Sequence, residues 1–301
     1  MKLLAFSREG RASYGLLSGD GIVDAGSRLS QHWPTLSAVV RAGAVDELRD
    51  RVAGLGPDFS VDGVSFLPPI LDPGRILCVG LNYRTHIEET GREIPAHPTI
   101  FVRFPDSHVG HRECMVRPAV SEEFDFEGEL AFIVGRGGRH ISASDALGCV
   151  AGYSCYNDGS VRDFQRHASQ FTAGKNFWHS GAFGPWMVTA DEIPDPASLA
   201  LETRLNGKVM QSASTADLLF DIPYLVEYLS TIFPLCPGDV VSTGTTGGVG
   251  RARKPPVFMR PGDWIEVEIS GIGTLSNPVV AEDRRTSILS TGAGSAATRG
   301  R

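Results

Sequence analysis

Short segments in which hydrophobic and polar residues alternate recur along the chain, and this pattern is typical of β-strands with one buried face. Beyond residue 98, the segments that fit best read TIFVRF, ELAFIVG, VAGYSCYN, GPWMVTA, LALETRLNG, DVVSTG and DWIEVEISG. Helical spacing is rarer, and it predicts helices near residues 83–90, 142–147 and 222–233. Many short strands with few helices predict an α+β fold whose β-rich core is antiparallel or mixed.

The first 70 residues predict a small α+β domain of their own. The stretches MKLLAFS, ASYGLLS and GIVDAG read as strands separated by turns, and a helical stretch follows near residues 36–55. The proline-rich segment FLPPILDPGR, residues 66–75, predicts a hinge. We therefore expect a larger catalytic domain over residues 71–285, and a flexible tail over the small, polar and glycine-rich residues 286–301.

Composition narrows the class of protein. Charged residues make up 21% of the 301 residues and the hydrophobic set 42%, and the net charge is −7 without a long basic cluster. This balance argues against nucleic acid as a partner. No apolar run approaches the ~20 residues that cross a membrane, and the apolar start of the chain is too short for a signal peptide. The five cysteines are scattered without metal-site spacing, so we expect reduced thiols in a cytoplasmic protein.

The segment DFEGELAFIVG, residues 125–135, places carboxylates at the start of an otherwise apolar strand. Alternation puts Glu127 and Glu129 on the same face as Ala131 and Ile133, and the intervening apolar residues on the opposite face. Like charges in such a place repel each other and are costly to bury, so a divalent cation between them would explain the pattern. The alternative is an edge strand whose acidic end is solvated.

Asp158, in the stretch CYNDGSVRD, is a third acidic candidate, because it follows a predicted buried strand where the chain turns outward. Together with Glu127 and Glu129 it would form a set of oxygen ligands that suits Mg²⁺ or Mn²⁺. Asn-Asp-Gly is also strong turn chemistry, so Asp158 has an alternative role as a turn residue. Asp163 is a competing candidate that spacing alone does not exclude.

His86 and Glu89, in NYRTHIEETG, are three residues apart on a predicted helix and therefore share one face of it. A glutamate beside a histidine can orient the imidazole, so that the pair would act as a general base toward water. The alternative is an ordinary surface helix that ends at Gly91.

Further polar candidates follow the acidic turn. Arg162 and Gln165 could hold a substrate carboxylate, and Lys175 could stabilise an oxyanion or an enolate, unless these side chains are simply solvated. The stretch STGTTGGVG, residues 242–250, lacks the Gly-Lys-Ser/Thr ending of a P-loop, which excludes a nucleotide site of that kind. Its backbone N–H groups and the Thr245 hydroxyl could still line an anionic pocket; the alternative is a long hairpin turn.

The order of these segments is more informative than any one of them. Between about residues 75 and 280 the chain reads GLNY-x-x-H-x-x-E, DFEGEL, NDGSVRDFQ, GKNF, GPWMVTADEI, PGDVVSTGT-x-GGVG and PGDWIEVEISGIGTLSNPV. In this series the chain resembles the fumarylacetoacetate hydrolase superfamily.

The resemblance implies a catalytic fold described as a mixed β-sandwich roll, usually in a homodimer, with Mg²⁺ or Mn²⁺ bound by carboxylates. It also implies a mobile lid that carries a water-activating His–Glu dyad. The matching positions in this chain are, for the metal, Glu127, Glu129 and Asp158; for the dyad, His86 and Glu89; for catalysis, Lys175; and for substrate binding, Arg162, Gln165 and Thr245.

The activity that the resemblance implies is hydrolysis of a carbon–carbon bond in a 2,4-dioxo acid, an acylpyruvate such as fumarylpyruvate, to pyruvate and a second acid. A first alternative is a 2-oxo acid hydratase or isomerase, or an oxaloacetate decarboxylase, on the same metal site. A second alternative, of another class, is a metal-binding protein without catalysis.

Three places depart from the family pattern. They affect the expected identity of the substrate more than the expected binding of the metal. The stretch RFPDSHVG replaces a usual lysine-proline-rich segment, Gly159 stands where a hydrophobic residue is common, and Thr246 stands where proline is usual. Candidates for compensating polar contacts in the pocket are Arg103, His108, His111 and His179.

Overall fold

The strand that follows the acidic segment lies in the interior of the fold. β11 (Gly128–Val134) is buried along its whole length. Leu130 and Phe132 belong to one hydrophobic cluster and Ala131 and Ile133 to another, so the two faces are the ones that alternation predicted. The computed structural model describes residues 1–283, and the predicted tail over residues 286–301 lies outside the described residues.

β11 belongs to a mixed sheet of 12 strands. Its main path runs through β4 (Phe59–Ser60), β3 (Gly21–Asp24), β2 (Arg11–Ser18), β1 (Lys2–Arg8), β14 (Gly181–Thr189), β12 (Val150–Asn157), β11, β17 (Val240–Thr245), β6 (Ile76–Gly80) and β7 (Thr99–Arg103). Two short strands join beside this path, β5 (Ser65–Leu67) on β1 and β8 (His108–Val109) on β14. The β17–β6 pair is parallel, which makes the sheet mixed.

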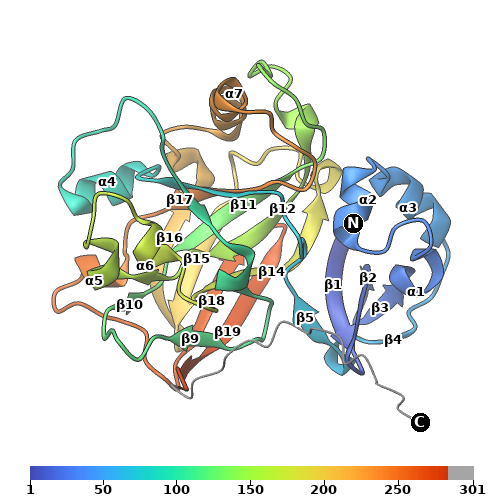
Figure 1. Ribbon diagram of the computed structural model, residues 1–301, viewed down its shortest axis with the longest axis horizontal. Coiled ribbons are helices and arrows are strands. Elements are labelled where there is room, and N and C mark those ends of the chain that lie inside the picture. The colour runs from blue at the N-terminus through green and yellow to red at the C-terminus, as the bar shows by residue number, and fades with distance from the viewer. Residues whose placement is uncertain (284–301) are drawn as a thin grey trace, which may run out of the picture.

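A second sheet packs against the first and closes the core (Figure 1). Its five strands are β16 (Lys208–Ser214), β15 (Ala200–Leu205), β18 (Trp264–Ile269), β19 (Gly273–Ala281) and β9 (Met115–Arg117). Phe132 of β11, Val267 of β18 and Leu275 of β19 share one hydrophobic cluster. A separate two-stranded pair joins β10 (Phe124–Asp125) to β13 (Ser160–Val161). The predicted β-rich α+β class with a mixed core is confirmed.

The helices differ from the prediction in two places. The stretch expected to be one helix over residues 36–55 forms α2 (Leu36–Arg41) and α3 (Val45–Val52), because Gly43 between them adopts a left-handed φ of 64° that ends the first. The helix predicted at residues 142–147 is wrong. That segment forms turns before a short 3-10 helix, and Ser142 Oγ donates to Asp145 Oδ2 at 2.7 Å, a local bond that competes with helix formation.

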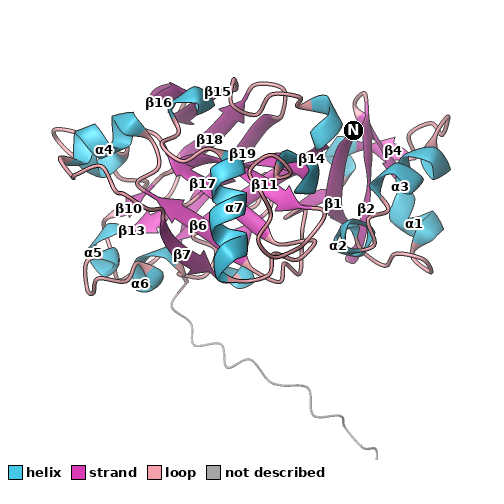
Figure 2. Ribbon diagram, turned by 90° about the horizontal axis from the view of Figure 1, so that it is seen from above, coloured by secondary structure: helices cyan, strands magenta, loops and turns pink. Residues whose placement is uncertain are grey.

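Two predicted helices are present, and α7 (Ile222–Ile232) covers part of the core. It begins at Asp221, whose side chain caps the Tyr224 N–H, and it buries Leu225 and Leu229 in the large cluster. Figure 2 shows α7 crossing the strands. α4 (Arg84–Thr90), α5 (Arg162–Gln165) and α6 (Thr172–Lys175) lie at the end of the molecule opposite the N-terminal segment with its α1 (Ala25–Leu29).

The N-terminal segment extends the main sheet. β1 pairs with β14 in antiparallel register, with Leu3 opposite Met187, and both residues belong to one hydrophobic cluster. The predicted division near residue 70 therefore remains a prediction about folding units. All five cysteines are free. Within residues 1–283, no helix combines the length and hydropathy that crossing a membrane requires.

Candidate active site

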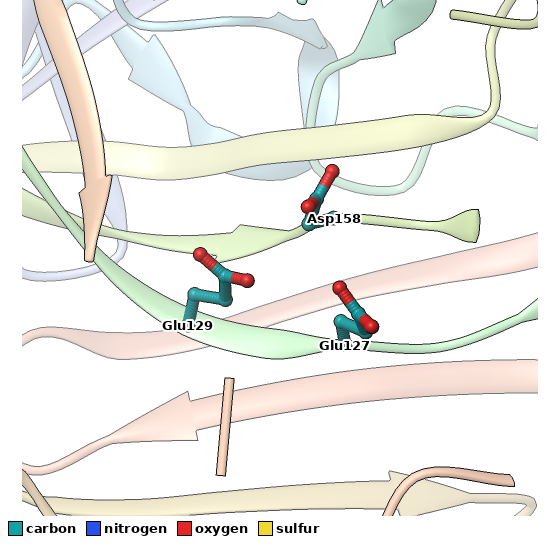
Figure 3. Close-up of side chains that lie close together, drawn as sticks. All are labelled: Glu127, Glu129 and Asp158. Carbon is teal, nitrogen blue, oxygen red and sulfur yellow. The ribbon is translucent and has the colours of Figure 1, made fainter. Parts of the chain in front are cut away.

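Three buried carboxylates meet where β11 and β12 lie side by side. Glu127 immediately precedes β11, Glu129 is its second residue, and Asp158 follows β12. The antiparallel register pairs Gly128 with Asn157, and the Asp158 N–H donates to the Glu127 carbonyl at 2.8 Å. One oxygen of each carboxylate lies within 4.8 Å of the others. Figure 3 shows Glu127 and Glu129 rising from one strand, with Asp158 on the neighbouring segment.

This arrangement excludes the solvated edge strand and the competing Asp163. β11 is an interior strand between β12 and β17, and Glu127, Glu129 and Asp158 are at most 5% exposed, so the segment is no solvated edge. Asp163 lies outside the cluster, and its carboxylate accepts a hydrogen bond from Ser121 Oγ at 2.7 Å.

Cationic side chains surround two of the three carboxylates. Lys175 Nζ lies 2.5 Å from both Glu127 Oε2 and Asp158 Oδ2. Arg162 reaches the other Glu127 oxygen at 2.7 Å, and Arg103 reaches the other Asp158 oxygen at 2.5 Å. Lys175 is 1% exposed and Arg162 is 5% exposed, so the alternative of solvated side chains is wrong for both.

Glu129 lacks a cationic partner among the described residues. Its Oε2 instead accepts hydrogen bonds from Ser242 Oγ at 2.5 Å and from the Gly244 N–H at 2.9 Å. Burial and the negative charges of Asp158 and Glu127 raise the pKa of Glu129 well above its ordinary value.

Glu127, two residues away, titrates in the opposite direction. Burial opposes its ionisation, but the charges of Arg162 and Lys175 outweigh that effect and lower its pKa to about 2. Burial would also favour neutral Lys175, yet Asp158 and Glu127 outweigh it and raise the lysine pKa. We therefore expect Glu127 to be ionised and Lys175 to be charged at neutral pH.

The predicted His–Glu pair lies beside these carboxylates. α4 carries both residues one turn apart, and His86 Nδ1 lies 2.7 Å from Glu89 Oε1. Glu89 Oε2 accepts a second hydrogen bond from the Gly248 N–H at 2.8 Å, which fixes the carboxylate. Because Nδ1 is engaged, Nε2 is the ring nitrogen of His86 that is available for proton transfer. His86 is 7% exposed, whereas Glu89 and most of α4 are exposed, so the histidine is not an ordinary surface residue although the helix lies at the surface.

The glycine-rich segment 242–250 binds carboxylates of the protein itself. Its N–H groups donate to Glu129 from Gly244, to Glu89 from Gly248 and, at 2.8 Å, to Asp125 from Gly250. The expectation that these N–H groups line an anionic pocket was therefore wrong for these three. The segment therefore holds three carboxylates at and beside the cavity in place.

Thr245 of this segment faces the cavity, but its hydroxyl is engaged. It accepts a hydrogen bond from Gln211 Nε2 at 2.8 Å and donates to the Gly128 carbonyl at 3.0 Å. These bonds tie the second sheet to the start of β11. A direct role of Thr245 in substrate binding remains a prediction.

One cavity of about 410 Å³ connects the carboxylates with the His86–Glu89 pair. This volume lies within the range of about 300–1,000 Å³ that is usual for small-molecule sites. The predicted site residues that line it are His86, Glu89, Glu127, Glu129, Asp158, Arg162, Gln165, Lys175 and Thr245. The structure thus brings every predicted site residue to a single cavity, while their chemical roles remain predictions.

Comparison with known proteins places this site in a family. The family described as "Fumarylacetoacetate (FAA) hydrolase C-terminal" matches residues 75–280. The chain belongs to the fumarylacetoacetate hydrolase family. It is 41% identical over 218 residues to the mitochondrial oxaloacetate tautomerase Fahd2a of Rattus norvegicus, which covers 72% of this chain and 70% of that protein.

Solved structures of the family share the fold. The chain is similar to the fumarylacetoacetate hydrolase from psychrophilic Exiguobacterium antarcticum, with 36% identity and a TM-score of 0.80. It is also similar to the maleylpyruvate hydrolase from Sphingobium sp. SYK-6 in complex with manganese(II) ion and pyruvate, with 29% identity and a TM-score of 0.78. Each similarity covers 94% of this chain and 100% of the solved chain.

The donor set fits the divalent ion expected for the family. Mg²⁺ and Mn²⁺ prefer carboxylate oxygens, and the cluster in the described residues contains neither histidine nor cysteine. Glu129 faces two other carboxylates without a cationic partner from residues 1–283. A divalent ion held by Glu127, Glu129 and Asp158 would offset their repulsion and lower the raised pKa of Glu129.

The stretch RFPDSHVG contacts the site from the protein interior and not from the cavity. Arg103 does not line the cavity, and its guanidinium contacts the Asp158 carboxylate from the protein interior. His108 is fully buried near Arg103, and burial together with that positive charge holds its pKa well below the ordinary value. His111 and His179 are also absent from the described cavity wall, so polar contacts from the three histidines to a substrate there are not supported.

Two departures from the family pattern have local structural reasons. A Cβ on Gly159 would lie 1.9 Å from the Ser180 carbonyl oxygen, so only glycine fits at this position. Thr246 places its hydroxyl 3.2 Å from that of Thr85, which connects the glycine-rich segment to the start of α4.

Asp125 is a supporting residue of the site that the sequence interpretation left without a role. Its Oδ2 accepts from Arg162 Nε at 2.8 Å, and its Oδ1 accepts from the Gly250 N–H. It therefore positions the arginine that contacts Glu127. A third carboxylate in DFEGE was the available signal, but its partners lie far away in sequence.

Proposed function

We propose that the protein is a Mg²⁺- or Mn²⁺-dependent enzyme that hydrolyses a carbon–carbon bond in 2,4-dioxo acids, acylpyruvates such as fumarylpyruvate. The observation that supports this most directly is the His86–Glu89 pair, with its imidazole buried, beside the carboxylate triad. An oriented base facing a metal site serves proton transfer, whereas metal binding alone does not require one.

The cavity walls supply the groups that orient a 2-oxo acid. When bound, the divalent ion supplies Lewis-acid polarisation of the 2-oxo group and stabilises negative charge that develops there. Arg162 donates to Gln165 Oε1 at 3.0 Å, which leaves the amide N–H₂ of Gln165 available for a substrate oxygen. Arg162 and Gln165 would in this way fix the substrate carboxylate.

In the proposed hydrolysis, His86 accepts a proton from water through Nε2 while Glu89 holds Nδ1–H. The water oxygen attacks C4, the C3–C4 bond breaks, and its electron pair forms the enolate of pyruvate. The Lys175 ammonium, held by Glu127 and Asp158, stabilises that negative charge. Protonation of the enolate at C3 gives pyruvate, and the other fragment leaves as a carboxylic acid.

Tautomerisation of oxaloacetate is a second candidate function. It is favoured by the relative that is 41% identical and is named an oxaloacetate tautomerase. The reaction moves one proton between the enol oxygen and C3, breaks no carbon–carbon bond and consumes no water. His86 would transfer that proton, and Lys175 would stabilise the same enolate charge.

A panel of 2,4-dioxo acids together with oxaloacetate separates these functions. We would follow ultraviolet absorbance and pyruvate release with Mg²⁺ or Mn²⁺, with and without EDTA, and with His86→Asn as a control. Metal-dependent loss of diketo absorbance with pyruvate release is the expected result. Faster loss of enol-oxaloacetate absorbance without pyruvate would assign the tautomerase, and pyruvate from oxaloacetate alone would assign a decarboxylase. No metal-dependent turnover of either class would overturn the proposed substrate class.

We also propose that the enzyme works as a homodimer on a small-molecule substrate in the cytoplasm, on the basis of the family resemblance. Light scattering on the purified protein, coupled to gel filtration, measures its assembly directly. A mass twice that of the chain is the expected result, and a mass equal to one chain would contradict the dimer.

A further inference from the structure

Four arginines line the cavity, and within residues 1–283 only two of them have ion-pair partners. Arg162 pairs with Asp125 and Glu127, and Arg166 pairs with Glu123 at 2.9 Å. The side chains of the other two, Arg92 and Arg251, make no ion pair or hydrogen bond within residues 1–283, although both line the cavity. The structure thus holds two unneutralised cations at the site.

These cations lie apart from the metal-binding end. Arg92, Arg166 and Arg251 are exposed, whereas Glu129 and Asp158 are buried, so the arginines form the outer part of the same cavity. Partial burial and the charges of Arg166 and Arg162 lower the pKa of Arg251, and they outweigh the opposing charge of Glu123. A guanidinium stays charged at neutral pH, so Arg92 and Arg251 present positive charge to an anion that enters the cavity.

We propose that Arg92 and Arg251, beside Arg166, bind a second carboxylate at the far end of the substrate, and that they select dicarboxylic over monocarboxylic 2-oxo acids. The inference rests on the proposed function, in which the first carboxylate and the 2-oxo group lie at the triad. Arginine suits this role because its planar donors match a carboxylate.

The positions of two of these arginines connect substrate binding to the His86–Glu89 pair. Arg92 follows α4 directly after Gly91, which ends the helix with a φ of 64°. Arg251 follows the glycine-rich segment, whose Gly248 N–H holds Glu89. A carboxylate shared by Arg92 and Arg251 would therefore join α4 to this segment from the substrate side. The distal carboxylate would in this way keep the His86–Glu89 pair beside the three metal-binding carboxylates.

The test compares two 2-oxo acids of equal carbon-chain length that differ in the distal carboxylate, 2-oxoglutarate and 2-oxopentanoate. Their binding to the Mn²⁺-loaded protein is measured by isothermal titration calorimetry. Oxalate serves as a reference ligand that is short enough to bind at the metal without reaching the arginines. The variants are Arg92→Gln and Arg251→Gln. The matched control is Arg11→Gln, which removes an exposed arginine of β2 in the N-terminal segment.

We expect the wild-type protein and Arg11→Gln to bind 2-oxoglutarate at least tenfold more tightly than 2-oxopentanoate. Arg92→Gln and Arg251→Gln should each weaken 2-oxoglutarate binding about tenfold, because a charge-assisted contact is lost, and should leave oxalate and 2-oxopentanoate unchanged. Raising the salt concentration should reduce the wild-type preference.

Two results would overturn the inference, and they differ from each other. Metal-dependent oxalate binding with an unchanged preference in both arginine variants would reject the distal subsite alone. Absence of Mn²⁺-dependent binding of oxalate and of both 2-oxo acids would reject the proposed function and the subsite together.

Discussion

Glu127 and Glu129 show how strongly single side chains depend on their immediate neighbours. They lie two residues apart and both are buried, yet Glu127 faces Lys175 and Arg162 while Glu129 faces other carboxylates. Their pKa values shift in opposite directions for this reason. The same substitution at the two positions should therefore have different effects.

We predict that Glu129→Gln leaves the stability of the metal-free protein unchanged or slightly raised, because it replaces a carboxyl that lacks a cation with a neutral group of similar shape. Glu127→Gln should lower the free energy of unfolding by about 3–5 kcal/mol, since it leaves Lys175 and Arg162 short of a buried partner. Urea unfolding in EDTA measures both effects. Equal destabilisation by the two variants would contradict the assigned environments.

Both variants should lose metal affinity by about 100-fold, because each removes one of three carboxylate ligands. Titration with Mn²⁺, followed calorimetrically, measures this loss. A variant that kept wild-type affinity would show that its carboxylate is not a ligand.

His111 predicts a separate dependence of stability on pH. Burial, with a contribution from Arg112, lowers its pKa to about 4, against an ordinary value near 6.5. The unfolded chain therefore takes up the proton first, and stability should fall by up to about 3 kcal/mol as the pH decreases from 6.5 to 4. His111→Asn keeps an acceptor for the Ser276 N–H but does not titrate, so it should unfold with a shallower pH dependence in this range. An unchanged pH profile in urea unfolding would contradict this assignment.

At the residue scale, the sequence indicated which side chains belong to the site better than it indicated which residues contact them. Alternation correctly placed Glu127 and Glu129 on one face, because side-chain direction in a strand is a local property. The contact of Arg103 with Asp158 joins residues 55 positions apart, and that of Gly250 with Asp125 joins residues 125 positions apart. Local spacing carries no information about such pairs.

At the scale of elements, the backbone of the glycine-rich segment is tightly constrained at Gly248. Gly248 has a φ of 98°, and a Cβ there would lie 2.3 Å from the Met210 carbonyl oxygen. Both facts restrict this position to glycine. The same residue donates the N–H that holds Glu89.

We predict that Gly248→Ala reduces turnover at least tenfold and weakens the fold, because the loop must move and release Glu89. Gly10→Ala is the matched control, since Gly10 also has a positive φ, 77°, but open space around it. Gly10→Ala should lower the free energy of unfolding by only about 1–2 kcal/mol and keep full activity. Steady-state kinetics and thermal unfolding of both variants provide the measurement. Full activity in Gly248→Ala would show that the dyad does not depend on this loop.

Length alone does not decide which elements were predicted, because the seven-residue β16 and the nine-residue β19 were not predicted as strands. β11, β12, β15 and β18 were predicted because each has enough residues for alternation to show. α5 and α6, with four residues each, and the two-residue β10 and β13 are too short to show a period. These short elements carry Arg162, Lys175 and Asp125, so the sequence missed the elements while it identified two of the three residues.

At the scale of the whole molecule, the main sheet joins the N-terminal segment to the catalytic part. β1 pairs with β14, and one hydrophobic cluster contains Leu3 and Trp33 from the first 70 residues together with Ala131 and Met187. Unfolding the N-terminal segment alone would expose the edge of β14 and part of that cluster. The sequence interpretation divided the chain at a proline-rich stretch, because strand pairing between distant segments leaves no local sign.

We predict that both parts unfold in one transition. Trp33 reports on the N-terminal segment in a variant whose other tryptophans, Trp178, Trp186 and Trp264, are replaced by phenylalanine. Its fluorescence should change at the same urea concentration as the far-ultraviolet circular dichroism of the whole chain. Two separate midpoints would instead support independent folding of residues 1–70.

The glycine-rich loop has a consequence for how enzymes of this kind can diversify. Three of its amides are spaced along the chain to match three carboxylates, on Glu129, Glu89 and Asp125. One inserted or deleted residue would shift these contacts together, so the length of the loop is fixed while its neighbours are free to vary. New substrate preferences should therefore arise by exchange of side chains at the cavity rim, such as Arg92 and Arg251, beside a loop whose length is kept.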